Sequence, residues 1–263
     1  MRRFAQTLWL TVRRRRYGVI DLVLFTAVLA GILIAWSASR ARQLSAAAFQ
    51  SPLPEVRAAE EELIPDSAAY RRQYDFTVNW FTWNIPVWET VLAPFQGKPD
   101  VRYLEVGVYE GRSAVWMLEH VLTHPTARLT GVDVFDGPHK DRCFANIERA
   151  GASAKATMIT GYSQLVLRGL PLNSFDIIYV DGSHAKNDVL EDAVLSWRLL
   201  REGGILIFDD YRWAGSFVSG TSDSPTDFPK AAIDPFVQCF EKQFDVIHNS
   251  YQLILKKKLT KDQ

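Results

Sequence analysis

Residues 101–113 read VRYLEVGVYEGRS, and this stretch decides the fold of the chain. An apolar strand pattern, which includes Glu105, leads into Gly107 and Gly111, and an apolar helical pattern follows over 112–122. Glycine permits the sharp turn and close backbone approach that a nucleotide-type cofactor requires, and the helix start offers it free N–H groups. Many strand–helix turns contain glycine for packing alone. The sequence after this turn therefore has to distinguish a cofactor-binding turn from a turn that only packs.

The composition limits the choice of function. The chain has 263 residues, with 30 Lys and Arg against 30 Asp and Glu, so its formal net charge is zero. This balance gives no reason to expect nucleic acid as a partner, because nucleic-acid binding needs a basic surface. Apart from an N-terminal segment, the chain fits one domain of about 200 residues. Cys143 and Cys239 lie far apart and lack the spacing of a metal site, so they decide little.

The N-terminal segment predicts attachment to a membrane. Residues 19–38 are almost wholly apolar except for Asp21, and about 20 such residues span a bilayer as a helix. We therefore predict a retained single-pass transmembrane helix. A cleaved signal peptide would have a shorter apolar region, and a buried soluble helix would have a polar face. The arginines at 13–16 place the N-terminus in the cytoplasm, whereas a cytosolic cofactor requires the domain there, so the side of the domain stays open.

The organisation follows from these features: a basic segment at 1–18, the transmembrane helix at 19–38, a linker at 39–69 and a domain at 70–263. The domain begins with an aromatic-dense segment at 70–92. This segment predicts a helix packed on the core, with a substrate-pocket wall or a membrane-interface rim as the alternative. The polar stretch at 212–228 is typical of a lid beside a site, with a disordered loop as the alternative.

From residue 101 the sequence alternates between strand and helix patterns. Strand patterns lie at 101–106, 128–134, 156–160, 175–181, 204–209, 244–248 and 251–257. Helical patterns lie at 112–122, 140–150, 163–169 and 186–200, and Gly203 and Gly204 are expected to stop the last one. The alternation predicts an α/β fold with a mostly parallel sheet and helices on both faces. Only Asn249 and Ser250 separate the last two strands, which predicts a closing antiparallel hairpin.

Polar side chains stand where these strands end. Ligands bind at the carboxyl ends of strands in an open parallel sheet, so we expect these side chains to form one site. Asp133 ends the second strand, 26 positions after Gly107, and such an acid can accept both ribose hydroxyls; a turn or capping aspartate is the alternative. Ser163 and Gln164 follow the third strand and suit an adenine edge, although Ser163 also suits a helix N-cap.

Three aspartates end two further strands and predict a metal site. Asp181 ends one strand, and Asp209 and Asp210 end the next, so their carboxylates would converge and repel one another without a cation. Oxygen ligands without a His/Cys cluster favour Mg²⁺, Mn²⁺ or Ca²⁺ over Zn²⁺, and solvated loop aspartates are the alternative. His184 stands three residues after Asp181 and is the candidate general base, with a helix-capping or surface histidine as the alternative. His139 is a weaker candidate base.

In this order, LEVGVYEGRS, GVDVFDG, GYSQ, FDIIYVDGSH and GGILIFDDY resemble class I S-adenosylmethionine-dependent methyltransferases. The branch of bacterial small-molecule and macrolide-sugar O-methyltransferases is the most similar, and catechol O-methyltransferase is more distant. The resemblance covers roughly 70–257 and implies a Rossmann-like, seven-stranded sheet whose last strand is antiparallel. Two features depart from the family: Tyr162 stands where many relatives have aspartate, and a transmembrane segment is not typical.

The resemblance also implies roles for individual residues. Glu105 and Gly107 would hold the methionine end and the sugar of S-adenosylmethionine, beside the helix start at Gly111. The ribose hydroxyls would fall to Asp133. The remaining assignments are adenine for Ser163 and Gln164, the metal for Asp181, Asp209 and Asp210, and the general base for His184.

The sequence thus predicts an S-adenosylmethionine-dependent, metal-assisted O-methyltransferase that acts on a hydroxyl of a small molecule, a sugar or a lipid-linked substrate. A second interpretation is a non-catalytic, membrane-anchored subunit that keeps this fold and binds other membrane proteins. A dinucleotide oxidoreductase is a third, which the turn disfavours because Tyr109 stands where the middle glycine of the fingerprint would be.

Overall fold

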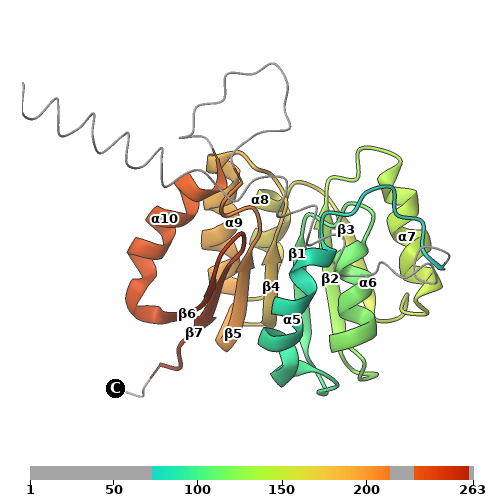
Figure 1. Ribbon diagram of the computed structural model, residues 1–263, viewed down its shortest axis with the longest axis horizontal. Coiled ribbons are helices and arrows are strands. Elements are labelled where there is room, and N and C mark those ends of the chain that lie inside the picture. The colour runs from blue at the N-terminus through green and yellow to red at the C-terminus, as the bar shows by residue number, and fades with distance from the viewer. Residues whose placement is uncertain (1–72, 214–227, 261–263) are drawn as a thin grey trace, which may run out of the picture. The chain divides into compact units, whose positions relative to one another are not determined.

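A seven-stranded sheet forms the centre of the domain (Figure 1). The structure is a computed structural model and describes residues 73–213 and 228–260. The strands follow the spatial order β3-β2-β1-β4-β5-β7-β6. They are β1 (Arg102–Val106), β2 (Arg128–Asp133), β3 (Ala156–Thr160), β4 (Phe175–Val180), β5 (Leu200–Phe208), β6 (Phe244–Asn249) and β7 (Leu253–Lys257).

The last strand in the chain runs against its neighbours. Strands β1 to β5 pair in parallel, whereas β7 lies between β5 and β6 and is antiparallel to both. The predicted Rossmann-like sheet, mostly parallel with an antiparallel last strand, is therefore confirmed. The carboxyl ends of β1, β2, β4 and β5 meet at one edge, where the predicted site residues stand.

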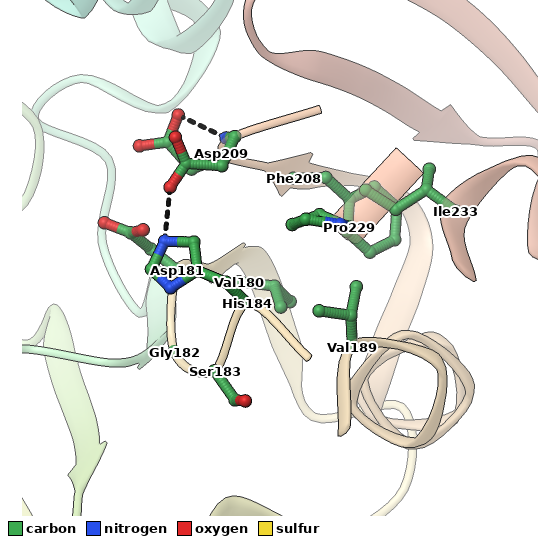
Figure 2. A pocket seen from close by; sticks show the side chains of 11 residues that line it. Val180, Asp181, Gly182, Ser183, His184, Val189, Phe208, Asp209, Pro229 and Ile233 are labelled. Carbon is green, nitrogen blue, oxygen red and sulfur yellow. Dashed lines mark hydrogen bonds and ion pairs between the residues drawn. The ribbon is translucent and has the colours of Figure 1, made fainter. Parts of the chain in front are cut away.

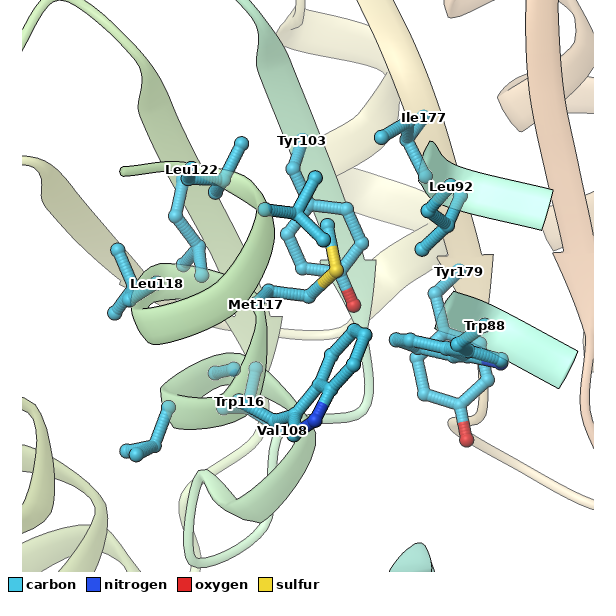
Figure 3. Close-up of a cluster of buried hydrophobic side chains, with 14 of the residues drawn as sticks. Trp88, Leu92, Tyr103, Val108, Trp116, Met117, Leu118, Leu122, Ile177 and Tyr179 are labelled. Carbon is cyan, nitrogen blue, oxygen red and sulfur yellow. The ribbon is translucent and has the colours of Figure 1, made fainter. Parts of the chain in front are cut away.

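Helices cover both faces of the sheet, as predicted (Figure 1). Successive strand residues point to opposite faces, so Tyr179 enters one hydrophobic core and Val180 the other. Figure 3 shows part of the first core, where Trp88 and Trp116 pack beside Tyr179. One face carries α5 (Ile85–Leu92), α6 (Arg112–Trp116) and α7 (His139–Arg149); the other carries α8 (Ser163–Val166), α9 (Lys186–Leu199) and α10 (Pro229–Phe240).

The predicted stop of the fourth helix was misplaced. Helix α9 ends at Leu199 and β5 begins at Leu200, so Gly203 and Gly204 lie inside the strand. A Cβ on Gly204 would lie 2.8 Å from the carbonyl oxygen of Asp176 on the neighbouring strand. Glycine is therefore required there for the close approach of two backbones, not for ending a helix.

Helix α10 was not predicted. It begins with Pro229, contains Pro235 and follows a polar stretch, and these features obscure its pattern. Its apolar residues nevertheless recur at helical spacing, and Ile233 and Phe236 are fully buried against the second core. This periodicity was the signal that could have revealed the helix.

The aromatic segment at 70–92 supplies core residues, as predicted. Phe81 and Trp88 are buried and pack edge to face, with ring centroids 4.9 Å apart. Trp80 is the exception, with 60% of its surface exposed. The buried aromatic side chains of the segment therefore pack α5 against the sheet. Most of the predicted lid, 214–227, lies outside the described residues.

The predicted single-pass membrane localisation requires correction. Among residues 73–213 and 228–260, no helix combines the length and the apolar character that a bilayer crossing demands. The longest, α9, has 14 residues, against about 20 for a span, and it is amphipathic because one side packs on the sheet. The segment 19–38, on which the prediction of a transmembrane helix rested, lies outside the described residues.

Candidate active site

The glycine turn joins the ends of two strands. Gly107 has a φ of +85°, and a Cβ on it would lie 2.0 Å from the carbonyl oxygen of Asp181. Gly111 has a φ of +81° and occupies the N-cap position of α6. The predicted strand–turn–helix unit is therefore present. Gly107 is needed because the end of β1 packs directly against the backbone that follows β4.

Glu105 lies buried behind this turn. Its carboxyl group accepts hydrogen bonds from the hydroxyls of Tyr103, at 2.9 Å, and Ser113. Burial raises the pKa of Glu105 to about 8, although the two hydroxyls act in the opposite direction. Through these two contacts Glu105 links β1 to the start of α6, on either side of the glycine turn. Its contact with the methionine end of a cofactor stays a prediction.

Asp133 holds the turn from the side of β2. It accepts hydrogen bonds from the backbone N–H groups of Val108 at 2.8 Å, Tyr109 at 2.9 Å and Phe135 at 2.8 Å. These are the contacts of a turn aspartate, the alternative that the sequence left open. The ring of Tyr109 stacks on His139, with centroids 4.9 Å apart, so His139 lies beside Asp133 and away from the aspartate cluster. Ribose binding by Asp133 stays a prediction.

Ser163 and Gln164 open α8, at the end of β3. Burial raises the pKa of Asp192 on α9 to about 6, and the nearby Ser163 hydroxyl acts in the opposite direction. The Asp192 carboxylate oxygens are buried without a hydrogen-bond partner among the described residues. Ser163 therefore faces α9 as well as the sheet edge, and adenine binding stays a prediction for both residues.

The acidic cluster lies at the ends of β4 and β5 (Figure 2). One ligand atom each from Asp181, His184 and Asp210 lie within 4.8 Å of one another. His184 Nε2 is 2.6 Å from Asp210 Oδ2. Asp209 is not one of these three residues but borders them. It accepts a hydrogen bond from the Tyr179 hydroxyl, which also lies 2.9 Å from Asp181, and another from the Asp210 N–H at 2.9 Å. His184, the predicted base, thus lies close enough to the carboxylates of Asp181 and Asp210 to act as a ligand as well.

Burial and mutual repulsion dominate the electrostatics of this cluster. Burial raises the pKa of Asp181 well above its usual range, and repulsion from Asp209 and Asp210 adds to the effect. The pKa of Asp209 is raised for the same reasons, burial first. The hydrogen bond to Asp210 raises the pKa of His184. A cation would offset the negative charge of these carboxylates, and the oxygen atoms of Asp181 and Asp210 suit a hard divalent ion.

A small cavity opens beside the cluster (Figure 2). Asp181, His184 and Asp210 form its polar side, and Trp213 packs near His184 with ring centroids 4.8 Å apart. The opposite side is apolar and is formed by Val189, Phe208, Pro229 and Ile233. The space is large enough for about one small polar group or ion beside the carboxylates, and its apolar side is part of the second core.

Sequence reasoning missed three residues that touch the acidic cluster. Tyr179 stands two positions before Asp181 in a strand, so both side chains point to the same face, and this spacing was a usable signal. The Tyr251 hydroxyl donates a hydrogen bond to Asp210, and Gln252 lies beside Asp209. Both belong to the β6–β7 hairpin, and no local pattern could have placed them here.

Comparison with known proteins gives a consistent result. A family model described as a methyltransferase domain matches residues 104–211. A protein of Mycobacterium sp. (strain JLS), named as an O-methyltransferase, is 30% identical over 155 residues, or 58% of this chain and 68% of that protein. The chain spans about half to two thirds of the length of the curated relatives that it matches.

Solved structures share the fold. An O-methyltransferase from Bacillus cereus in complex with SAH superimposes with a TM-score of 0.55 at 17% identity, covering 76% of this chain and 96% of that one. MycE methyltransferase from the mycinamycin biosynthetic pathway, in complex with Mg, SAH and mycinamycin VI, gives a TM-score of 0.51 at 18% identity, covering 72% and 53%.

Proposed function

Because the chain belongs to the class I S-adenosylmethionine-dependent O-methyltransferase family, we propose that it methylates a hydroxyl oxygen of a small molecule with the help of a divalent cation. The single observation that supports the cation is the cluster of Asp181, His184 and Asp210, whose ligand atoms lie within 4.8 Å of one another. We do not retain the non-catalytic anchored subunit, because family membership and this cluster both favour catalysis.

The cation would be Mg²⁺, with Mn²⁺ or Ca²⁺ as substitutes. Its proposed ligands are Asp181, Asp209 and Asp210, because carboxylate oxygens are the ligands that such ions prefer. Burial, followed by repulsion from the neighbouring aspartates, raises the pKa values of Asp181 and Asp209, and the charge of a cation would offset both effects. When bound, a divalent cation would lower the pKa of a coordinated hydroxyl.

The cofactor would lie over the glycine turn. We propose that Glu105, Gly107 and Gly111 receive its methionine end, that Asp133 receives the ribose, and that Ser163 and Gln164 receive the adenine. These residues stand at the ends of β1, β2 and β3, along one edge of the sheet. The SAH in the Bacillus cereus and MycE structures, and the Mg in MycE, support this proposal by analogy of fold.

His184 is the proposed base for the reaction. A bond forms between the hydroxyl oxygen and the methyl carbon while the bond from that carbon to sulfur breaks, and the hydroxyl proton passes to His184. Asp210, 2.6 Å from Nε2, would orient the ring and stabilise its protonated form. The neighbouring Trp213 would limit the entry of water. Catalysis would rest chiefly on positioning and on electrostatic stabilisation of the developing oxyanion.

The space beside the cluster does not select among substrates. Its apolar lining belongs to the core, because Phe208 and Ile233 have no exposed surface and Val189 has 4%. A phenol, a diol, a sugar hydroxyl or a lipid-linked hydroxyl would each suit the carboxylates. The identity of the substrate requires screening.

Calorimetric titration of the full chain with S-adenosylmethionine, with and without Mg²⁺, tests the proposal. We expect micromolar binding, or about −8 kcal/mol, and a separate Mg²⁺ isotherm. A folded sample that binds neither ligand would contradict it. Binding of S-adenosylmethionine alone would retain the methyltransferase and remove the cation.

A further inference from the structure

The direction of β7 brings the β6–β7 hairpin to the acidic cluster. Phe208, the last residue of β5, pairs with Leu253, the first residue of β7. The two strands are antiparallel. Asp209 and Asp210 directly follow β5, and Tyr251 and Gln252 directly precede β7, so the two pairs of residues lie at the same end of this strand pair.

Each hairpin residue meets one carboxylate. The Tyr251 hydroxyl donates a hydrogen bond to Asp210 Oδ1. Gln252 is only 2% exposed and lies beside Asp209, and its Nε2 is buried with no hydrogen-bond partner among the described residues. Gln252 Nε2 is thus a buried donor on the Asp209 side of the cluster.

Trp88 fixes the orientation of Gln252. The indole Nε1 donates to Gln252 Oε1 at 2.8 Å, so the amide nitrogen of Gln252 must point the other way, towards Asp209. The same indole packs edge to face on Tyr179, with centroids 4.9 Å apart and planes at 89° (Figure 3). The Tyr179 hydroxyl lies against Asp209 and is 2.9 Å from Asp181. One buried tryptophan therefore holds two side chains that contact the aspartates.

We propose that Tyr251 and Gln252 are positioning residues, which fix the carboxylates of Asp210 and Asp209 so that both can hold a divalent cation. This inference rests on the proposed function. The two residues touch the proposed ligands and not the reacting atoms. Polar groups that orient metal ligands typically contribute about 10- to 100-fold to metal affinity, because a free carboxylate must otherwise be ordered when the ion binds.

The test measures Mn²⁺ affinity of the purified full chain by calorimetry, which is independent of turnover. Tyr251→Phe removes only a hydroxyl, and Gln252→Met keeps the length of the side chain but removes its amide. We expect each variant to bind Mn²⁺ at least about tenfold more weakly than the original chain. Thermal midpoint and S-adenosylmethionine affinity should stay unchanged in Tyr251→Phe. If Gln252→Met does not fold, Tyr251→Phe decides the outcome.

A matched control exists in the chain. Trp197 Nε1 donates to Gln243 Oε1 at 3.3 Å, which is the same kind of pair on the other face of the sheet. Gln243→Met should leave Mn²⁺ affinity unchanged. An equal loss in this control, or unchanged affinity in both hairpin variants, would overturn the positioning role while leaving the metal proposal intact. If the original chain itself binds no Mn²⁺, the metal proposal fails and the positioning role fails with it.

Discussion

His184 Nε2 lies 2.6 Å from Asp210 Oδ2, and this pair joins the turn after β4 to the end of β5. The contact places an imidazole at the mouth of the cluster of carboxylates, and it raises the pKa of His184. In this arrangement His184 can be either a proton acceptor or a third metal ligand. Loss of the ring would lower turnover if His184 is the base, and would lower metal affinity if His184 is a ligand.

Replacement of His184 by glutamine separates these roles. If His184 is the base, turnover should fall by roughly 10²- to 10⁴-fold and the rising limb of the pH profile of kcat/KM should disappear, while Mn²⁺ affinity changes little. Mn²⁺ titration and pH-dependent kinetics of the same sample measure both effects. A large loss of Mn²⁺ affinity would instead identify His184 as a ligand.

Removal of either strand-end aspartate should abolish metal-dependent turnover. Asp181→Ala and Asp209→Ala each remove a proposed oxygen ligand, whereas the glycine turn that would hold S-adenosylmethionine keeps its contacts. We expect cofactor binding to stay within a few-fold of the original chain. Full activity of either variant at saturating Mg²⁺ would contradict the assignment of that aspartate to the metal.

The metal-free protein should become less stable as the pH rises. The folded state raises the pKa values of Asp181 and Asp209 above their unfolded values, mainly through burial, so the folded state binds more protons than the unfolded state. Stability must then fall between about pH 4, the ordinary carboxyl pKa, and the raised folded values. Thermal melts in a chelating buffer from pH 5 to pH 8 measure this trend.

Two changes should flatten that pH dependence. Asp209→Asn removes one titrating carboxyl, and Mn²⁺ compensates the charge of those that remain. Mn²⁺ should therefore raise the thermal midpoint more at pH 8 than at pH 5. A midpoint that rises with pH in the metal-free protein would contradict the arrangement of charges described above.

Gly107 should be intolerant of a side chain. A Cβ there would lie 2.0 Å from the Asp181 carbonyl oxygen, and the φ of +85° adds strain. Gly151 has a comparable φ of +64° but nothing within 4 Å, so it isolates the conformational cost, which is about 1–2 kcal/mol. We expect Gly107→Ala to cost a further ~1–3 kcal/mol beyond Gly151→Ala. Denaturant unfolding of both variants provides the comparison, and equal losses would show that the close approach does not matter.

Local sequence patterns determined the sheet. Apolar runs predicted all seven strands, six of them within two positions, because a central strand with helices on both faces of the sheet is buried on both sides. Asn249 and Ser250 gave the antiparallel hairpin, and the acids at strand ends marked the functional edge. The start of β5 and the whole of α10 were not predicted. Glycines lie inside β5 and prolines inside α10, although both residue types usually mark the end of an element.

Only the tertiary structure decided which partner each polar side chain meets. Asp133 could bind a ribose or a turn, and its three backbone contacts became visible only once β2 lay beside the glycine turn. Trp88 and Gln252 are 164 positions apart, and their hydrogen bond beside Asp209 exists because β7 reverses direction next to β5. The sequence by itself determines periodicity, turns and the residues available at each strand end. Contacts between distant segments depend on the order and direction of the strands in the folded sheet, which a local sequence pattern does not specify.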